Sequence, residues 1–454
     1  MKAQILIAAI IAAIIMATTA LDLNPELGGR RWYVGGLFNK INGTTDDSIE
    51  GGAVQNLAYF DGSQWKKLEG KGPNGPVYVI KMDTKFNLIV GGKFTTVNDV
   101  PTGPVARYNS KDGKWESIVG SGTFSTGSRV HAIATDCFPQ EKSTANAKNQ
   151  LTGTRCDVYF GGYFNITGDV TCQNVARWQQ TSNTEGKLLN LGTHGIKGTV
   201  YALYKKSLLT LTGASDTYLW VGGDLKVAGG PKYFARFEKI FDAGEETLVN
   251  LDGEGEDAIT GVVRKFRYVN KYLAGQTDRL FLAGNFQVAS KKCRNICEYN
   301  HKNKEFVALN GADTFTDGEG YDVALNSEDV YVGGTFTKPI KYVSFLPNEK
   351  EAWDGVHASQ TANFDFPVHT MDVCSKYSKS CQAGSVAVGN MDGRIKFYDS
   401  ENGKFEYFGT SQRPINQTTS DDVMLGAIYS YAAAGHLQVT FVVLAIVSAL
   451  AMIL

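Results

Sequence analysis

Short apolar runs that end in paired glycines recur along this chain, and each is followed by polar residues and a second short run. The clearest copy is the stretch 88–115, whose sequence is LIVGGKFTTVNDVPTGPVARYNSKDGKW. Its short apolar and β-branched runs are typical of strands, and its Asp112-Gly113 dipeptide is typical of a two-residue hairpin turn. The stretch is therefore predicted to form two β-hairpins.

This order of residues is repeated along the chain, and the first glycine of each pair, or its equivalent, marks each copy. The copies are spaced by 50 to 70 residues, which is the length of a four-stranded unit. Repeats of this kind form circular or stacked β architectures. Seven copies predict an all-β, seven-bladed β-propeller, with six or eight blades as the alternatives. The marker residues are Gly35, Gly91, Gly161, Gly222, Ala283, Gly333 and Gly389.

Each copy is predicted to contain four strands, A to D, in chain order. Strand A is an alternating run such as 76–82 and strand B carries the glycine pair. Strand C ends on an aromatic residue such as Tyr108, and strand D carries a bulky residue such as Trp115. A glycine inside a strand costs stability and packs no side chain. Its recurrence predicts a crowded position where innermost strands of neighbouring sheets meet, with the aromatic residues packing each sheet against the next.

The first copy begins directly at its strand B, so it lacks a strand A. Residues 422–429, DVMLGAIY, follow the last strand D and have the alternation of a strand. If this segment pairs with the first sheet, it closes the ring and leaves no free sheet edge. The alternative is that residues 421–435 are a plain linker.

The repeat "VGG-x-F … N-x-AR-aromatic … W" resembles kelch-like, galactose-oxidase-type β-propeller repeats. It is similar to those of the fungal cortical polarity-marker membrane glycoproteins, over residues 33–408. The resemblance implies a propeller fold and specifies function poorly, because the matching residues are structural. The chain departs from that family in being far shorter, in lacking a basic cytoplasmic tail, and in the drifted copies around Ala283, Gly333 and Gly389.

Both ends of the chain are apolar and predict three parts: a signal peptide at 1–20, the propeller at 21–430 and a tail at 431–454. A membrane-spanning anchor is the alternative at the N-terminus. Residues 437–454 carry no charge and no basic flank follows them. This favours a glycolipid-anchor signal, with a true membrane helix or a buried helix as alternatives. The predicted location is the extracellular face of the plasma membrane.

A secretory route predicts glycans and disulfides. Glycosylation sequons stand at Asn42, Asn165 and Asn416. Two cysteine pairs straddle the connection between strands A and B, so hairpin-closing disulfides are predicted there. These pairs are Cys137–Cys156 and Cys374–Cys381.

Three further cysteines are Cys172, Cys293 and Cys297. In a straight strand, positions 293 and 297 would lie about 13 Å apart, beyond the reach of a disulfide. A third disulfide therefore requires a turn or bulge at this point, and one thiol stays unpaired.

The composition gives few signs of catalysis. The net charge is −1 with 20% charged residues, which provides no basic excess for nucleic acid. The chain contains no HExxH, GxSxG or CxxC motif, so no catalytic residue is assigned and the protein is predicted not to be an enzyme. His131 and His369 share one position on strand A and are interpreted as packing residues.

Two acidic, glycine-rich connections lead from strand D to the next strand A. Hard oxygen ligands separated by glycine suit calcium, but solvated loop charge is the favoured interpretation, so no cofactor is predicted and calcium is the alternative. The candidate ligands are Asp252, Glu254, Glu256, Asp257, Asp313, Asp317, Glu319 and Asp322.

Two functions follow from these features. The first is a cell-surface, membrane-tethered, glycosylated propeller that binds a protein or glycan partner, in cell polarity or surface organisation. The alternative is a surface or secreted propeller enzyme of the galactose-oxidase or glycosidase type. The centre of the ring distinguishes them. Carboxylates, or histidine and tyrosine side chains, converging at the channel mouth would favour catalysis, and an apolar-plugged channel would favour the surface binding module.

Overall fold

The computed structural model describes most of the chain between residues 31 and 431. Within the described residues, no helix is long and apolar enough to cross a membrane. The predicted signal peptide at 1–20 and the tail 432–454 lie outside them. The described residues are 31–38, 40–41, 54–61, 65–139, 154–181, 185–191, 196–207, 217–238, 246–269, 279–310, 312–326, 329–339, 341–346, 353, 367–373, 386–390, 395–399, 404–407, 415–416 and 424–431.

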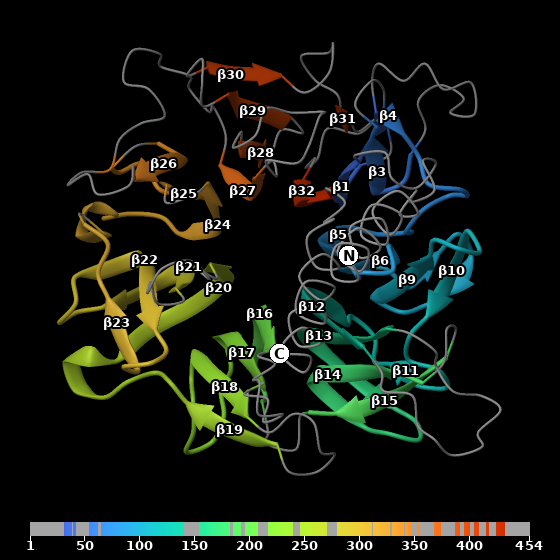
Figure 1. Cartoon of the computed structure of the whole chain (residues 1–454), viewed down its shortest axis with the longest axis horizontal. Helices are drawn as coiled ribbons and strands as arrows, with labels where there is room; N and C mark the ends of the chain where they lie inside the picture. The colour runs from blue at the N-terminus through green and yellow to red at the C-terminus, as the bar shows by residue number, and fades with distance from the viewer. Residues whose placement is uncertain are drawn as a thin grey trace, which may run out of the picture.

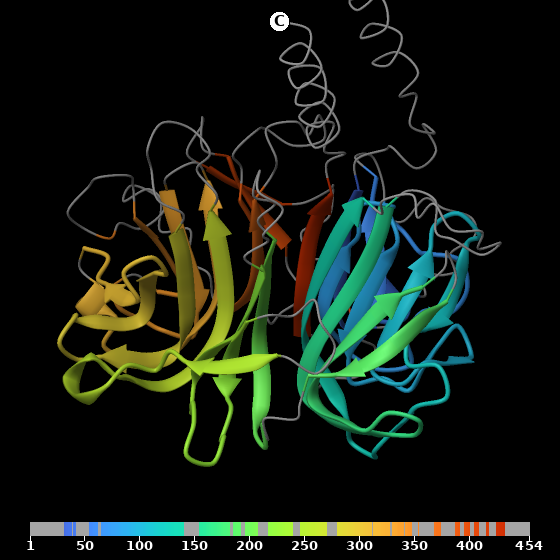
Figure 2. The ribbon, with the colours of Figure 1, turned by 60° about the horizontal axis from the view of Figure 1, so that its bottom comes forward.

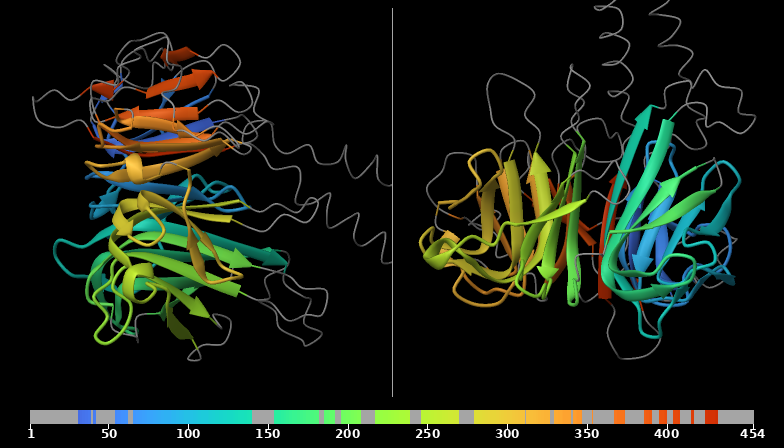
Figure 3. Two further views of the ribbon diagram at one scale, coloured as in Figure 1. Left: turned by 90° about the vertical axis from the view of Figure 1, so that its left-hand side faces the viewer. Right: turned by 90° about the horizontal axis from the view of Figure 1, so that it is seen from below.

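The described strands form a β-propeller, in which antiparallel sheets are arranged around a central axis (Figures 1 and 3). Sheet 1 contains β32 (Met424–Tyr431), β1 (Arg31–Leu37), β3 (Leu57–Phe60) and β4 (Trp65–Lys66). Sheet 2 contains β5 (Val77–Met82), β6 (Leu88–Gly92), β9 (Val105–Asn109) and β10 (Lys114–Ser117). Sheet 3 contains β11 (Thr123–Phe124), β12 (Arg129–Pro139), β13 (Thr154–Thr167), β14 (Cys172–Gln180) and β15 (Gly186–Asn190).

The other half of the ring follows in chain order. Sheet 4 contains β16 (Thr199–Ser207), β17 (Thr217–Asp224), β18 (Phe234–Glu238) and β19 (Thr247–Asn250). Sheet 5 contains β20 (Ile259–Val269), β21 (Arg279–Val288), β22 (Cys293–Asn300) and β23 (Glu305–Val307). Sheet 6 contains β24 (Gly320–Asn326), β25 (Asp329–Gly334) and β26 (Val343–Leu346). Sheet 7 contains β27 (Val368–Val373), β28 (Val386–Asn390), β29 (Ile395–Asp399) and β30 (Lys404–Tyr407).

Six of these sheets are complete blades, with four or five described strands each, and sheet 6 has three. Two small ladders add to them: β7 (Thr96–Val97) with β8 (Val100–Pro101), and β2 (Lys40–Ile41) with β31 (Ile415–Asn416). Short 3-10 helices occur at η3 (Gly255–Asp257) and η4 (Ala312–Thr314). The all-β propeller predicted from the sequence is therefore confirmed.

The ring is closed by pairing the last described strand with the first. Strand β32 is antiparallel to β1, with Tyr431 opposite Arg31 and Met424 opposite Leu37. It occupies the inner position of sheet 1, where the other sheets place their strand A (Figure 1). The closure predicted for residues 422–429 is confirmed, with the strand displaced by two residues. Because β1 is paired with β3 on one side and with β32 on the other, it is not a free edge on which another chain could add a strand.

The first glycine of each pair lies against the inner strand of the next sheet. A Cβ built on Gly161 would lie 2.5 Å from Cγ1 of Val200, and one built on Gly91 would lie 2.7 Å from Cγ1 of Val130. The sheet 5 copy reverses the arrangement, because Ala283 replaces the glycine and Gly320 takes the place of the opposing valine. The crowding predicted from the glycine pairs is therefore confirmed. In the drifted sheet 5 copy the glycine lies on the inner strand of the next sheet, and the larger residue lies on strand B.

Aromatic and aliphatic side chains fill the space between adjacent sheets. One hydrophobic cluster joins Trp220 and Phe234 of sheet 4 to Tyr299 and Phe306 of sheet 5. Another joins Val79 and other residues of sheet 2 to sheet 3. Each cluster spans two neighbouring sheets, so packing of one sheet against the next supplies the core, as predicted.

The antiparallel order gives the disc two different faces, seen obliquely in Figure 2 and edge-on in the right-hand view of Figure 3. The A–B and C–D turns lie on one face, and the B–C and D–A connections lie on the other. Because Arg31 and Tyr431 are opposite each other where β1 begins and β32 ends, both lie on the A–B side. We call this side the tail face and the opposite side the loop face.

Candidate functional site in the central channel

One residue bulges out of each inner strand, opposite the glycine pair. In sheet 2, for example, Val77 pairs with Gly92 and Val79 pairs with Gly91, which leaves Tyr78 between them without a partner in the ladder. The second glycine is required here, because a Cβ on Gly92 would lie 2.0 Å from the carbonyl oxygen of Pro76. The equivalent bulge residues are Tyr78, His131, Tyr201, Arg264, Tyr321, His369 and Gly426.

The bulge side chains contact one another from sheet to sheet and form a belt around the channel. Tyr78 stacks on His131 with ring centroids 5.0 Å apart and ring planes 7° apart, and His131 lies 5.0 Å from Tyr201. The Arg264 guanidinium lies 5.0 Å from the Tyr201 ring and 5.2 Å from the Tyr321 ring. Tyr321 stacks on His369 at 4.3 Å. The belt is therefore a continuous series of stacking and cation–π contacts.

Both histidines of the belt are held in the neutral form. Burial, together with the nearby Arg129 and Arg264 guanidiniums, lowers the pKa of His131 to about 3. Burial and Arg264 lower the pKa of His369 to about 4. The same positive charge opposes a bound metal cation, so the belt suits ring packing better than copper binding. This agrees with the interpretation of these two residues as packing residues.

A cavity of about 300 Å³ lies on the tail-face side of the belt, between β5, β12, β16 and β20. Tyr201, Tyr204, Phe266 and Tyr268 are among the rings that line it. Its charged lining residues are all basic, and they come from three of the four strands. They are Lys81, Lys205, Lys265 and Arg267.

Three carboxylates lie behind these basic groups, outside the lining. Lys205 Nζ lies 2.8 Å from Asp136 Oδ2, and Lys265 Nζ lies 3.3 Å from Asp322 Oδ2. Arg267 Nη2 lies 3.2 Å from Asp372 Oδ1. The carboxylates neutralise part of the charge and hold the cationic ends in place.

Lys81 lies among like charges in this cavity. Burial, together with Lys265 and Arg267, lowers the pKa of Lys81 to about 8, while Asp372 and Asp322 act in the opposite direction. Because the unfolded chain binds this proton more tightly, the stability contributed by this group rises as the pH increases from about 8 toward 10.5. At neutral pH the ammonium is therefore held in an unfavourable environment.

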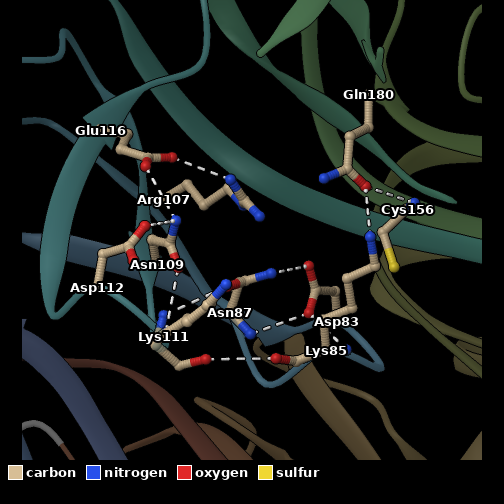
Figure 4. A network of polar contacts seen from close by, with 11 residues as sticks. Asp83, Lys85, Asn87, Arg107, Asn109, Lys111, Asp112, Glu116, Cys156 and Gln180 are labelled. Atoms are coloured by element: carbon tan, nitrogen blue, oxygen red, sulfur yellow. Dashed lines mark hydrogen bonds and ion pairs between the residues drawn. The ribbon is translucent and has the colours of Figure 1, made fainter. Parts of the chain in front are cut away.

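A polar network at the tail face stabilises the C–D hairpin of sheet 2, whose turn has the sequence SKDGKW at residues 110–115 (Figure 4). Asn109 donates hydrogen bonds to Asp112 at 2.9 Å and to Glu116 at 3.2 Å. Glu116 also pairs with Arg107 at 2.9 Å. These contacts hold the C–D hairpin together, so Asp112 and Glu116 stabilise the fold.

The same network continues into sheet 3 through the A–B turn of sheet 2. The buried carboxylate of Asp83 accepts hydrogen bonds from the side-chain amide of Asn87 at 2.8 Å and from the backbone of Lys85 at 2.8 Å. Lys85 Nζ donates to Gln180 Oε1 at 3.3 Å, and that oxygen also accepts from the backbone of Cys156 (Figure 4). Polar contacts thus tie the two sheets together at this face.

The candidate calcium ligands are used in several separate contacts. Asp252 is buried and accepts backbone hydrogen bonds from Phe234 at 2.7 Å and Tyr233 at 3.1 Å. Asp322 is also buried, and accepts from the backbone of Met371 at 2.9 Å. These two carboxylates hold strands and loops in place.

The other six candidates lie on the surface or near it. Glu319 pairs with Arg264 at 2.7 Å, Asp317 accepts hydrogen bonds from Thr337, and Asp257 accepts one from Ser290. Glu254, Glu256 and Asp313 are exposed. Among the described residues, no group of three or more histidine, cysteine, aspartate or glutamate side chains could hold a metal ion. The structure therefore does not bring the eight candidates together as one ligand set.

The predicted disulfide between Cys137 and Cys156 is present, with Cα atoms 4.0 Å apart. Cys374 and Cys381 lie outside the described residues. Cys172 is buried and free, and burial raises the pKa of its thiol to about 12.

Cys293 and Cys297 also form a disulfide, with Cα atoms 5.4 Å apart. A bulge makes this possible. Asn295 adopts a φ of 62°, and the register between β21 and β22 shifts around it. A third disulfide was predicted to require a turn or bulge between these two cysteines, and the bulge at Asn295 provides it.

Two sequons fall on described residues. Asn165 is exposed near the end of β13, where the chain turns toward β14 on the loop face. Asn416 belongs to β31 and pairs with Lys40 of β2. Asn42 lies outside the described residues, and follows β2 directly in the sequence.

The basic lining of the cavity was not found from the sequence. A signal was present, because Lys81, Arg267 and Asp372 occupy one repeat position on inner strands that are otherwise mainly apolar. Lys265 and Asp322 share the position two residues earlier. Charged residues at matching positions of a buried strand are expected to face one another across a channel.

The chain shows a distant similarity to three solved structures. No family model and no curated protein matches the chain, so the resemblance to the fungal family yields no family assignment. The WD40 repeats of RRP9 match with a TM-score of 0.41 at 9% identity, over 77% of this chain and 83% of that one. The structure of U3-55K matches with a TM-score of 0.41 at 9% identity, over 75% and 82%. YCF48 bound to D1 peptide matches with a TM-score of 0.34 at 13% identity, over 57% and 65%.

Proposed function

We propose that this protein is a cell-surface, membrane-tethered, glycosylated propeller that binds a protein or glycan partner through its loop face. A β-propeller is typically a binding or interaction module. The predicted tail attaches it to the outer surface of the plasma membrane, by a glycolipid anchor or by a membrane helix. The protein has no catalytic role in this proposal.

The observation that carries the proposal is the separation of features between the two faces. Arg31 and Tyr431, the ends of the described chain, lie on the tail face together with the Cys137–Cys156 hairpin. The sequon at Asn165 and the strand that carries Asn416 lie on B–C and D–A connections, which belong to the loop face. A tether at the tail face would turn the glycans and the loops away from the membrane, which is the orientation needed for binding an external partner.

Sheet 6 is the seventh blade in this proposal. Trp353 packs in a T-shaped contact with Phe315, with centroids 5.0 Å apart, and belongs to the cluster between sheets 5 and 6. A bulky residue at this point in the repeat is typical of strand D. Trp353 is therefore the residue on which the proposal of a seven-bladed ring rests.

The enzyme alternative would require copper ligands or paired carboxylates aimed into the channel. Histidine and tyrosine side chains do converge there. They stack on one another, and Arg264 lies between two of the tyrosines. By the criterion drawn from the sequence, this convergence counts toward the enzyme alternative. Because the rings stack on one another and lie beside the Arg264 guanidinium, we keep binding as the proposed function.

A glycan added to the loop face is expected to block partner binding. Ser121→Asn creates an Asn-Gly-Thr sequon on an exposed residue of the D–A connection after β10. Glu305→Thr is the matched control, because it creates a sequon at exposed Asn303 in the C–D turn of sheet 5, on the tail face. Chemical cross-linking on intact cells should give a shifted band for the wild-type protein and for Glu305→Thr. The band should be lost for Ser121→Asn.

The size of each variant on a gel before and after glycosidase treatment confirms that the new sites carry glycans. A cross-linked band that survives the Ser121→Asn glycan, or one that both variants lose equally, would contradict binding through the loop face.

A further inference from the structure

The cavity below the belt has an unusual lining for the centre of a propeller. All its charged lining residues are cationic, and they lie close enough to affect one another, since Lys265 and Arg267 both lower the pKa of Lys81. The carboxylates of Asp136, Asp322 and Asp372 pair with three of the four lining cations from behind.

We propose that this cavity binds a small soluble organic anion, with its charged group among Lys81, Lys265 and Arg267 and its remainder against the aromatic wall. A carboxylate or phosphate among these groups would relieve their mutual repulsion. Charge interactions are stronger in a buried cavity than in water. Arg267 also offers the planar fork of donors that matches such groups.

The dimensions and the walls of the cavity restrict the ligand. Its volume of about 300 Å³ is at the small end of the range for ligand pockets. Tyr204 and Tyr268 stack at 4.8 Å on one side, and both line the cavity, as does Phe266. A ring or sugar with one acidic group therefore fits the chemistry, and a large or neutral molecule does not.

This site is independent of the partner surface proposed above. The belt of stacked rings lies between the cavity and the loop face, and the cavity residues continue along the inner strands toward the tail face. Occupation of the cavity therefore does not require a partner on the loop face. Failure of the glycan experiment would leave the anion site standing, and the reverse is also true.

The test is calorimetric titration of the purified full-length protein in detergent with phenyl phosphate, and with benzyl alcohol as the neutral counterpart. Phenyl phosphate should bind and benzyl alcohol should not. Lys81→Met should weaken phenyl phosphate binding at least about tenfold, because it removes a buried positive charge with little change in volume. Lys302→Met, on an exposed turn, is the matched control and should change the affinity less than about twofold.

Two further measurements keep the test independent of folding. Lys81→Arg retains the charge and should retain binding within several-fold. In the wild-type protein, affinity should fall between pH 7 and pH 9, since Lys81, whose pKa is about 8, loses its proton over this range. Absence of phenyl phosphate binding at millimolar concentration, equal binding of benzyl alcohol, or an affinity that neither Lys81→Met nor the pH change reduces would overturn the proposal.

Discussion

Replacing Gly161 with alanine is expected to destabilise the whole propeller, and replacing Val200 with glycine in the same chain is expected to restore much of the loss. A Cβ at position 161 would lie 2.5 Å from Cγ1 of Val200 and 3.1 Å from Cδ1 of Leu203. Both contacts are with the buried inner strand of the next sheet, so neither side can move freely. Overpacking of this kind costs about 1–3 kcal/mol.

The double variant copies an arrangement that the chain already uses. Between sheets 5 and 6, Ala283 faces Gly320, where the other copies place a glycine against a larger residue. Val200→Gly alone leaves a cavity and weakens a strand, so it is also destabilising. Urea unfolding of the two single variants and the double variant measures the coupling free energy. We expect the double variant to be more stable than the sum of the singles by at least about 1 kcal/mol.

Additive losses would show that the two positions do not contact each other. The explanation of the glycine pairs would then be wrong for this interface.

Replacing Asp157 with asparagine should give a comparable or larger loss. This carboxylate is fully buried, and accepts hydrogen bonds from Arg177 Nη2 at 2.6 Å and from the backbone N–H of Gln180 at 3.2 Å. It also lies 3.2 Å from Arg155 Nε. Because the change leaves a buried guanidinium without its counter-charge, we expect the free energy of unfolding to fall by about 3–5 kcal/mol.

The matched control is Asp99→Asn, which breaks the exposed Lys71–Asp99 pair of 2.8 Å. An exposed pair contributes little, so its unfolding curve should overlay that of the wild-type protein. A loss for Asp157→Asn as small as for the control would mean that the Asp157 cluster does not stabilise the fold.

The fold could be predicted from the sequence because its strongest constraint is steric, and this constraint recurs in the repeats. Gly91 and Gly161 are glycines because the inner strand of the next sheet approaches them closely, and a glycine returns at this position in every copy except that of Ala283. The ring closure was also readable, because a missing strand in the first copy and a spare strand after the last are complementary.

The cavity could not be predicted in the same way. Lys81, Lys265 and Arg267 come from two sheets that are not consecutive in the chain. Only the curvature of the ring brings their charges together. The acidic loop residues failed as a ligand set for a related reason, since the sequence cannot tell a carboxylate that holds backbone amides, such as Asp252, from one that is free to bind calcium.

The most direct test of a surface propeller with its loop face outward is peptide mapping of the full-length protein recovered from the surface of intact cells. We predict a glycan on Asn165, a Cys137–Cys156 disulfide under non-reducing conditions, and release of the protein by phosphatidylinositol-specific phospholipase C if the tail is a glycolipid-anchor signal. An unmodified Asn165 together with a reduced Cys137 in the recovered protein would contradict the account.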